Sequence, residues 1–384
     1  MKVRFWGVRG STPTPSPDDF RYGGNTPCVE VRTPKGEILI LDGGSGLRML
    51  GKQLLLEFGP KSLEACVFFS HYHWDHIQGI PFFEPLYNPE NHFYFHSFPA
   101  QTRGVQEILE GQMSYPFFPV DMNTMRAHRH FDLVKEDSVV CRGVMVKVLP
   151  LNHPQGCLGY RLECNGHVLV YATDNEPGSL DHDRNVRKLA EKADVFIYDA
   201  QYTPLEYASQ KKGWGHSTWR EAVNIAQEAQ IKQLVLFHHD PDHKDAFIDS
   251  ILSETRKFFP NSVAAWEGME IDMALDEHLK PQDQEERRRN GTRQVARVPL
   301  KIRGQLNNGA PFEEQTMLEN LTLHGAYFLL ENDPDPQGPL EIEFQASLDA
   351  LFGQSFQVLK SQLVRSHAVK KSGQLKRGIA VVFH

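Results

Sequence analysis

The sequence has no uninterrupted apolar stretch of about 18 residues, the length that a membrane-spanning helix requires. Its first residues carry charge but lack the apolar segment of a secretory signal peptide. Internal repeats and low-complexity tracts are absent as well. From these absences we expect a soluble, cytoplasmic protein that makes no contact with a membrane.

Cysteine is scarce, and its pattern excludes the common cysteine-based frameworks. The five residues are odd in number, scattered, and form no Cys-x-x-Cys pair. This usage is typical of small buried hydrophobic side chains in a reducing compartment, not of a disulfide framework or a zinc ribbon. The five are Cys28, Cys66, Cys141, Cys157 and Cys164.

A basic excess is also missing. The chain has 41 Lys and Arg against 49 Asp and Glu, a formal net charge of −8. The acidic excess falls in residues 1–280, whereas residues 281–384 are nearly balanced. An acidic first part argues against non-specific nucleic-acid binding, and residues 1–275 contain no long basic, glycine-rich insertion that would grip a folded RNA. We therefore expect no stable nucleic-acid complex.

The length of 384 residues predicts two domains. Short strand-like and helix-like runs alternate through residue 273, which is typical of a layered α/β domain with mixed sheets and outer helices. Strands are predicted at 2–6, 28–32, 37–41, 65–70, 92–98, 144–149, 157–163, 167–172, 193–198, 233–237 and near 263, and helices at 47–57, 103–110, 217–229 and 242–259. We predict a first domain over 1–278, a polar linker over 279–292, and a small β-barrel over 293–384.

Four potential metal ligands lie within six residues: His71, His73, Asp75 and His76. They follow the predicted strand 65–70, so they lie where a buried strand ends and a loop begins. Imidazole and carboxylate groups suit zinc, manganese or iron. Burying them without a metal would leave polar groups unpaired, at about 1–3 kcal/mol each. The spacing therefore predicts a metal site and can supply ligands to two adjacent ions.

Three further candidates, His153, Asp174 and His238, each lie just past the carboxyl end of a predicted strand. Loops at one edge of a sheet can converge on one site. A turn histidine before proline remains the alternative for His153, and His239 could take the place of His238.

Together these elements resemble the metallo-β-lactamase-fold hydrolases across roughly residues 1–275. The resemblance implies an αββα sandwich that holds two divalent transition metal ions, zinc first, with manganese or iron as alternatives. It implies that His71, His73 and His153 bind the first ion, that Asp75, His76 and His238 bind the second, and that Asp174 bridges both.

Several details of that resemblance narrow the class of enzyme. Oxygen-reducing members of the fold have glutamate where this chain has His73, and true β-lactamases commonly use cysteine at the second metal. Residues 215–218, Gly-His-Ser-Thr, together with 5–11 and 23–26, are similar to the phosphodiesterase branch that includes tRNase Z and cyclic phosphodiesterases. The resemblance implies a metal-dependent phosphodiesterase.

The implied chemistry assigns roles to three side chains. Two metals can lower the pKa of a bridging water and clamp a phosphodiester. Asp75 or Asp174 could accept the proton of that water, and His216, with an unperturbed pKa near 6.5, could protonate the leaving alkoxide. The alternative for His216 is a helix-terminal position beside an N-cap at Ser217.

A small phosphodiester such as a cyclic nucleotide is the expected substrate, because the RNA-gripping insertion is missing. Segment 82–129, rich in Phe, Tyr and Pro, predicts either an aromatic wall that stacks a base or a hydrophobic subdomain. Asp42 and Asp199, at predicted strand ends, are candidates to orient ligand imidazoles. Hydrolysis of a lactone or thioester, and RNA processing, are the alternative activities.

The second domain carries Arg-Gln-Val-Ala-Arg at 293–297 and Asn-Leu-Thr-Leu-His-Gly at 320–325. This pair resembles the PilZ domain, a bacterial receptor for cyclic di-GMP, over about residues 285–384, with threonine where the family usually has serine. The implied ligand-binding residues are Arg289, Arg293, Arg297, Asn320, Thr322 and Gly325. Cyclic di-GMP would then regulate the hydrolase, or the protein would be a non-catalytic effector; the sequence leaves open the direction of regulation and whether the chain forms a homodimer.

Overall fold

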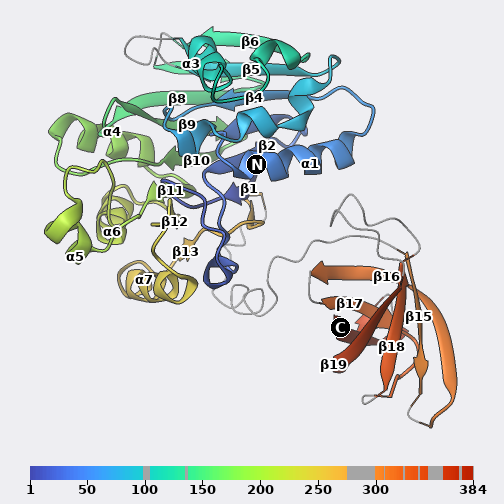
Figure 1. The fold of residues 1–384 in the computed structure, drawn as a ribbon. Coiled ribbons are helices and arrows are strands. Elements are labelled where there is room, and N and C mark those ends of the chain that lie inside the picture. The colour runs from blue at the N-terminus through green and yellow to red at the C-terminus, as the bar shows by residue number, and fades with distance from the viewer. Residues whose placement is uncertain are drawn as a thin grey trace. The chain divides into compact units, whose positions relative to one another are not determined.

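The computed structural model describes residues 1–97, 104–134, 137–274, 299–306, 308–322, 325–335, 338–344, 358–371 and 374–383. The chain divides into two compact units, Met1–Arg288 and Arg289–His384, and each is described by itself (Figure 1). The predicted linker, and with it Arg289, as well as Arg293 and Arg297, lie outside the described residues.

The first unit is built on two seven-stranded sheets. The first has the order β14-β1-β2-β3-β4-β5-β6 and contains β1 (Lys2–Gly7), β2 (Cys28–Arg32), β3 (Ile38–Leu41), β4 (Glu64–Phe68), β5 (His92–Ser97), β6 (His128–Leu133) and β14 (Glu270–Asp272). The second has the order β13-β12-β11-β10-β9-β8-β7 and contains β7 (Ser138–Cys141), β8 (Val144–Leu151), β9 (Cys157–Cys164), β10 (His167–Ala172), β11 (Val195–Asp199), β12 (Gln233–Phe237) and β13 (Ser262–Ala264).

Apolar side chains on the facing sides of the two sheets form one core. Leu41 and Phe68 of the first sheet are fully buried against residues such as Tyr171 and Phe237 of the second. Burial of this kind contributes about 1.5–3 kcal/mol for each large aliphatic or aromatic side chain. The outer faces carry two further apolar clusters, one beneath each layer of helices.

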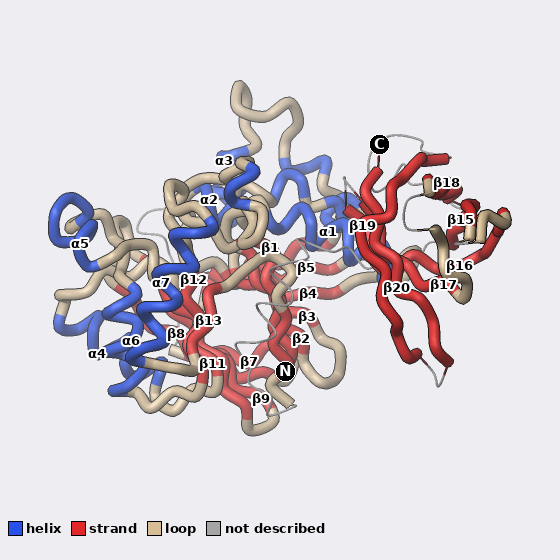
Figure 2. The backbone as a smooth tube through the Cα atoms, turned by 90° about the horizontal axis from the view of Figure 1, so that it is seen from below, coloured by secondary structure: helices blue, strands red, loops and turns tan. Residues whose placement is uncertain are grey.

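Helices cover both outer faces, which completes a helix-sheet-sheet-helix sandwich (Figure 2). The helices are α1 (Gly46–Phe58), α2 (Trp74–Ile77), α3 (Val105–Gln112), α4 (Leu180–Ala190), α5 (Pro204–Glu206), α6 (Trp219–Glu228) and α7 (Asp245–Phe258). The cluster on the second sheet includes residues of α4, α6 and α7, and the cluster on the first sheet includes residues of α1 and α3. The predicted αββα fold is confirmed.

Most predicted elements of this unit are present within one to three residues of their expected ends. Strands β6, β7 and β14 and helices α2, α4 and α5 were not predicted. Strand β6 is mostly exposed, so it lacks the apolar alternation that marks a half-buried strand. Helix α4 buries only Val186, Leu189 and Ala190, and its other positions are dominated by charged and polar residues.

Sharp turns at the strand ends direct polar side chains to one edge of the sandwich. Asp42, Asp174 and His238 directly follow, or lie one residue beyond, β3, β10 and β12, and their φ angles are 61°, 54° and 61°. This left-handed conformation costs a non-glycine residue roughly 1–3 kcal/mol and clusters at functional sites. The packing of the two sheets holds the three residues in this conformation.

The second unit contains a closed six-stranded barrel in the order β15-β16-β17-β20-β19-β18. Its strands are β15 (Pro299–Gln305), β16 (Pro311–Thr322), β17 (Gly325–Leu330), β18 (Pro339–Phe344), β19 (Val358–Lys371) and β20 (Gln374–Phe383). Leu300, Ile302 and Ile342 are fully buried in it. Strands β16 and β17 pair antiparallel, with Thr322 opposite Gly325.

The cysteine prediction is wrong in one respect, because Cys66 and Cys141 form a disulfide. Cys66 lies on β4 and Cys141 at the end of β7, so the bond joins the two sheets across 75 residues of sequence, a proximity that spacing alone does not reveal. The other three cysteines are free. Separately, no helix in the described parts of the chain combines the length and apolar character needed to cross a bilayer.

Candidate metal centre

The His-x-His-x-Asp-His segment divides into two parts with different backbone conformations. His73 is extended, with φ −62° and ψ 152°, and it forms the N-cap of α2. Asp75 and His76 lie inside that single turn of helix. The change from extended chain to helix lets the segment present its side chains to two neighbouring points.

The first group of candidate ligands consists of His71, His73 and His153, whose ligand atoms lie within 4.8 Å of one another. His73 Nδ1 and His153 Nε2 are 3.1 Å apart. Asp174 Oδ1 lies 3.7 Å from His153 Nε2 and 3.8 Å from His71 Nε2. The predicted ligands of the first ion therefore lie together although they come from three separate loops.

The second group of candidate ligands consists of Asp75, His76 and His238. His76 Nε2 is 3.3 Å from His238 Nε2 and 3.2 Å from Asp75 Oδ2. Asp174 Oδ2 lies 3.3 Å from His76 Nε2 and 3.4 Å from His238 Nε2. The two carboxylate oxygens of Asp174 thus face different groups of ligands.

The geometry distinguishes His238 from its neighbour. His238 is fully buried and its Nε2 also lies 3.3 Å from Asp75 Oδ2. His239 turns the other way, with Nε2 2.9 Å from the carbonyl oxygen of Ala265. Burial and then the nearby Arg9 guanidinium lower the pKa of His239 to about 3, so this side chain is a neutral structural residue.

In three of the candidate ligand histidines, the ring nitrogen that points away from the proposed metal position contacts a residue outside the two groups. His76 Nδ1 donates to Asp42 Oδ2 at 2.8 Å, and His153 Nδ1 lies 2.7 Å from the carbonyl oxygen of Gly215. His238 Nδ1 lies 3.2 Å from Gln201 Oε1. Such partners fix the tautomer and leave the inward nitrogen free to accept a metal.

A metal pair fits the chemistry of this donor set. Asp42, Asp75, Asp174 and Asp199 are all at most 6% exposed, and among the described residues their ion pairs are with histidines alone. Unpaired buried carboxylates are costly, so a cation is the natural complement. Within the described part of the chain, the buried Nε2 of His71 has no hydrogen-bond partner, as expected for an atom that faces a ligand.

The pKa shifts of the donors agree with this fit. Burial, followed by the neighbouring His76, holds the pKa of His71 well below its ordinary value, so the ring is neutral and able to bind a metal. Burial would raise the pKa of Asp174, but His238, His76 and His71 hold it well below its usual range. The carboxylate is therefore ionised, as a bridging ligand must be.

His216 lies beside both groups without belonging to either predicted ligand set. Its Nδ1 is 3.0 Å from Asp199 Oδ2 and 3.6 Å from Asp174 Oδ1. Burial alone would lower the pKa of His216, but Asp199 and then Asp174 raise it above its ordinary value. Asp199 therefore orients this residue, and Thr218, not Ser217, caps α6 behind it.

The amino-terminal segment 9–11 braces the second group. Ser11 N–H donates to Asp75 Oδ2 at 2.8 Å. A Cβ at Gly10 would lie 2.6 Å from His238 Nδ1, so only glycine at this position leaves enough space for the imidazole ring. Arg9 is fully buried and donates to the carbonyl oxygens of Gly23 and His243, which ties this segment to the loop after β12.

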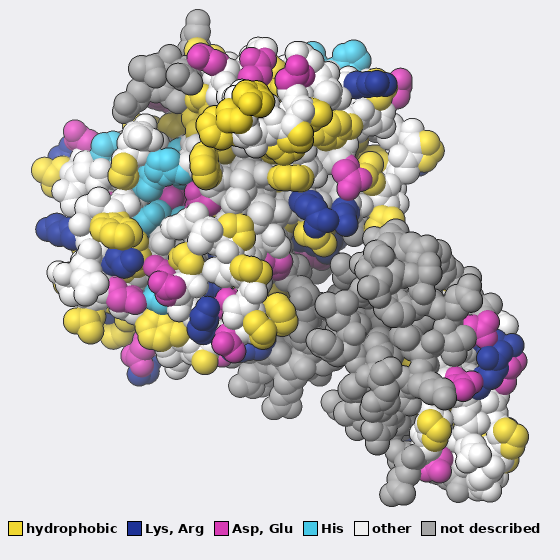
Figure 3. Space-filling model, viewed as in Figure 1, with side chains coloured by type: hydrophobic (Ala, Val, Ile, Leu, Met, Phe, Trp, Pro, Cys, Tyr) yellow, Lys and Arg dark blue, Asp and Glu magenta, His cyan; other side chains and the backbone are white. Residues whose placement is uncertain are grey.

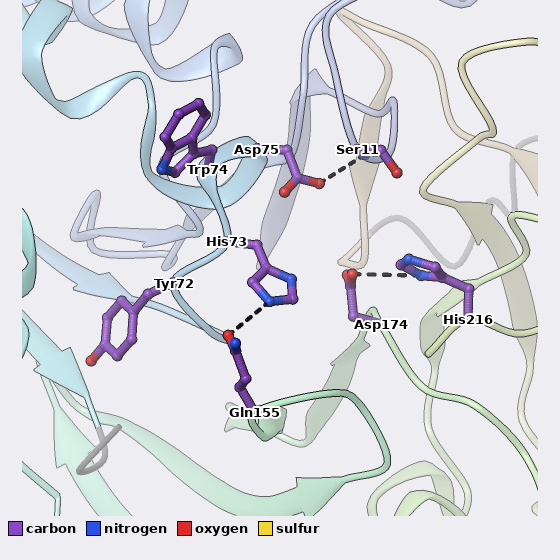
Figure 4. Close-up of a pocket in the computed structure, with 8 residues that line it drawn as sticks. All are labelled: Ser11, Tyr72, His73, Trp74, Asp75, Gln155, Asp174 and His216. Atoms are coloured by element: carbon purple, nitrogen blue, oxygen red, sulfur yellow. Dashed lines mark hydrogen bonds and ion pairs between the residues drawn. The ribbon is translucent and has the colours of Figure 1, made fainter. Parts of the chain in front are cut away.

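A cavity of about 500 Å³ opens at the two groups. Figure 3 shows histidine side chains gathered at this place on the surface, and Figure 4 shows Tyr72 and Trp74 across His73 from Asp174 and His216. The lining residues are Ser11, Tyr72, His73, Trp74, Asp75, Gln155, Asp174 and His216.

The aromatic lining comes from an unexpected part of the chain. Tyr72 and Trp74 occupy the variable positions of the His-x-His-x-Asp-His segment, and Trp74 is 79% exposed. Segment 82–129 was expected to form either an aromatic wall or a hydrophobic subdomain. Phe83 and Phe93 of that segment are buried in the cluster with α1, and none of its described residues, 82–97 and 104–129, is among those that line the cavity. The burial of these described side chains agrees with the second alternative.

Comparison with known proteins agrees with the geometry. A family model described as a beta-lactamase superfamily domain matches residues 41–239. A ribonuclease Z from Methanosarcina mazei is 26% identical over 329 residues, covering 71% of this chain and 98% of the relative.

Two solved structures share the fold. The metallo-β-lactamase fold protein YhfI from Bacillus subtilis has a TM-score of 0.52 at 19% identity and covers 70% of this chain and 98% of its own. Zn²⁺-bound PqqB from Methylobacterium extorquens has a TM-score of 0.53 at 14% identity and covers 71% and 100%. The family model spans more than half of the chain, and the chain therefore belongs to the β-lactamase superfamily, as a metal-dependent hydrolase.

Proposed function

We propose that the first unit hydrolyses phosphodiester bonds with two divalent transition metal ions. His71, His73 and His153 would hold one ion, Asp75, His76 and His238 the other, and Asp174 both. The observation that carries the proposal is the position of the Asp174 carboxylate, with Oδ1 3.7 Å from His153 Nε2 and Oδ2 3.4 Å from His238 Nε2. Zinc suits the imidazole and carboxylate donors best, with manganese or iron as alternatives.

The metals would supply an activated water and positive charge next to the phosphate. The protein's own residues position the substrate and move protons. Asp75 receives the Ser11 N–H and faces the cavity, so it can hold the proton of an incoming water. His216 lines the same cavity with its Nδ1 hydrogen-bonded to Asp199, and it can donate a proton to the departing alkoxide.

A small phosphodiester such as a cyclic nucleotide is the substrate class we propose. A cavity of about 500 Å³ matches a nucleotide-sized ligand, and the exposed Trp74 offers a face on which a base can stack. The acidic composition and the missing basic insertion weigh against a folded RNA. The likeness to a ribonuclease Z favours the second candidate, cleavage of an RNA.

A substrate panel distinguishes these activities. The full chain is stripped with a chelator, reloaded with zinc, manganese or iron(II), and offered cyclic nucleotides, dinucleotides, short RNAs, bis(p-nitrophenyl) phosphate and a lactone. We expect turnover of the small phosphodiesters that is lost on chelation and restored by metal. Turnover of the lactone alone would contradict the proposal, and so would inertness of metal-loaded protein on every substrate, which would favour a non-catalytic effector.

Two histidine variants test whether His238 is a metal ligand. His238→Gln removes a predicted ligand, whereas His128→Gln changes an exposed histidine on β6. We expect the first to lose bound metal and activity and the second to retain both. Equal metal content and turnover in the two variants would exclude His238 from the centre.

For the second unit we propose binding of cyclic di-GMP, which would regulate the hydrolase. The closed barrel supports this proposal, as does the pairing of Thr322 with Gly325 at the end of the β16–β17 hairpin. Arg289, Arg293, Arg297 and Asn320 complete the proposed set. Guanidinium groups can stack on guanine and bind phosphate through two hydrogen bonds. The coupling to the first unit would be about 1–3 kcal/mol.

Calorimetric titration of the full chain with cyclic di-GMP tests this proposal. We expect binding by the wild type and its loss in Arg293→Ala/Arg297→Ala. Arg303→Ala is the matched control, because that guanidinium is already engaged by Glu313 and Glu343 at 2.8 and 3.0 Å. Equal affinity of the wild type and the double variant for cyclic di-GMP, or binding by neither, would contradict the proposal.

A further inference from the structure

A second cluster of potential metal ligands lies away from the proposed active site, between the two sheets. Cys66, His96 and Cys141 place their ligand atoms within 4.8 Å of one another. All three are buried, at 1%, 7% and 6% exposure. Cys66 and Cys141 are joined as a disulfide.

His96 is the unexpected member of this cluster. On β5 it stands opposite Phe68 of β4, two residues from Cys66, and its ring stacks on Phe68 at 4.7 Å. Its side chain therefore lies on the same face of the sheet as Cys66, toward the core between the sheets.

Neither ring nitrogen of His96 has a hydrogen-bond partner among the residues that the structure describes, although both are buried. Leaving such a group unsatisfied costs about 1–3 kcal/mol, and a disulfide alone gives no reason to place an imidazole there. Burial lowers the pKa of His96 despite the nearby Asp132. The ring is therefore neutral, which is the form that binds a metal.

The Cys66–His96–Cys141 cluster has a carboxylate beside it and lies near solvent. Asp132 Oδ2 lies 3.7 Å from His96 Nδ1, and the Asp132 side chain is 55% exposed. Asp132 lies on β6 and Cys141 ends β7, and these are the last strands of their two sheets. The cluster therefore lies at an edge of the sandwich, where a cation can enter.

We propose that Cys66 and Cys141, when reduced, bind a thiophilic divalent cation such as Zn²⁺ together with His96, with Asp132 beside the imidazole. Two thiolates and one histidine form a common zinc donor set. Zinc–sulfur bonds of about 2.3 Å in tetrahedral geometry would set the two sulfurs about 3.8 Å apart. The cation and the disulfide therefore exclude each other, and either one cross-links the sheets.

The exchange between the two states balances with a dithiol as reductant. The dithiol transfers two electrons and two protons to the Cys66–Cys141 bond and becomes a disulfide itself. The cation then displaces both thiol protons, which pass to solvent. In the reverse direction the oxidised dithiol, now a disulfide, accepts two electrons from the two thiolates and two protons from solvent, so that the Cys66–Cys141 bond forms again and the cation is released. This site is independent of the phosphodiesterase proposal, since it shares no residue with that centre.

Cobalt(II) reports this site selectively. The seven ligands proposed for the active centre contain no sulfur, so thiolate-to-cobalt charge-transfer absorbance in the near ultraviolet can arise only from cysteine. The full chain is reduced with dithiothreitol under nitrogen, desalted and titrated with Co²⁺. We expect the sulfur band to appear in reduced protein, to saturate within about three equivalents because the proposed active centre can take two of them, and to be absent from oxidised protein.

Three variants complete the test, with circular dichroism to verify folding. Cys66→Ser/Cys141→Ser should lose the band, and Cys164→Ser, which changes a free, half-buried cysteine, should keep it. His96→Phe preserves stacking on Phe68 and should weaken cobalt binding by at least about tenfold. Should the double variant not fold, His96→Phe decides alone. A missing band in folded, reduced wild type, a band in the double variant, or unchanged affinity in His96→Phe would overturn the proposal.

Discussion

His76 Nδ1 donates to Asp42 Oδ2 at 2.8 Å, while the opposite nitrogen of the same ring faces Asp75, Asp174 and His238. Asp42 is itself held by the N–H of Ser70 and by the hydroxyl of Tyr171, each at 2.7 Å. One buried carboxylate thus fixes the orientation of a predicted ligand without reaching the metal site.

Replacing Asp42 with Asn removes the charge that orients His76. We expect a roughly 10–100-fold loss of metal affinity at the second group, because outer partners of ligand histidines typically contribute that much. Competition with a chromophoric chelator measures the affinity. Tyr171→Phe, which removes a single hydrogen bond to the same carboxylate, should lose less; an unchanged affinity in Asp42→Asn would show that His76 needs no anchor.

Asp174→Asn tests the residue that faces both groups. Asparagine tolerates the left-handed backbone, with φ 54°, that Asp174 adopts, so the fold should persist. We expect fewer bound metals per chain, and a loss of turnover greater than the roughly 100-fold upper range of an outer partner. Elemental analysis counts the metals. Thermal unfolding with and without zinc supplies the control, since zinc should stabilise the wild type more than the variant.

Gly10→Ala tests the space beside His238. The added Cβ would lie 2.6 Å from His238 Nδ1, so the ring must move and its contact with Gln201 must weaken. We expect reduced metal affinity and turnover in a folded protein. Gly111→Ala in α3 is the matched change, because a Cβ there meets nothing within 4 Å; equal activity of the two variants would contradict the steric argument.

His216→Gln tests the proposed general acid through the leaving group. Glutamine can still donate to Asp199 but cannot supply a proton. Turnover of phosphodiesters with alkoxide leaving groups should fall by about 10²–10⁴, whereas bis(p-nitrophenyl) phosphate, whose leaving group needs no proton, should lose far less. A similar loss of kcat/KM on both substrates would mean that His216 positions other groups and donates no proton.

Much of the site could be predicted because metal chemistry restricts the residue types. His71, His73, Asp75 and His76 are identifiable from their spacing, and the remaining candidates from their places after apolar strands. Elements without an apolar pattern were harder to predict. Exposed β6 and polar α4 carry too few buried positions for periodicity to reveal them.

The sequence by itself determined the chemical identity of the candidate donors and the strand ends that carry them, since both follow from residue type and local pattern. Only the tertiary structure decided which donors share a group, that Asp174 faces both, and that His238 turns inward while His239 turns away. It also decided that His96 stands beside Cys66 and Cys141. The reason is physical: these contacts join strands and loops far apart in the chain, and the packing of two sheets sets their distances.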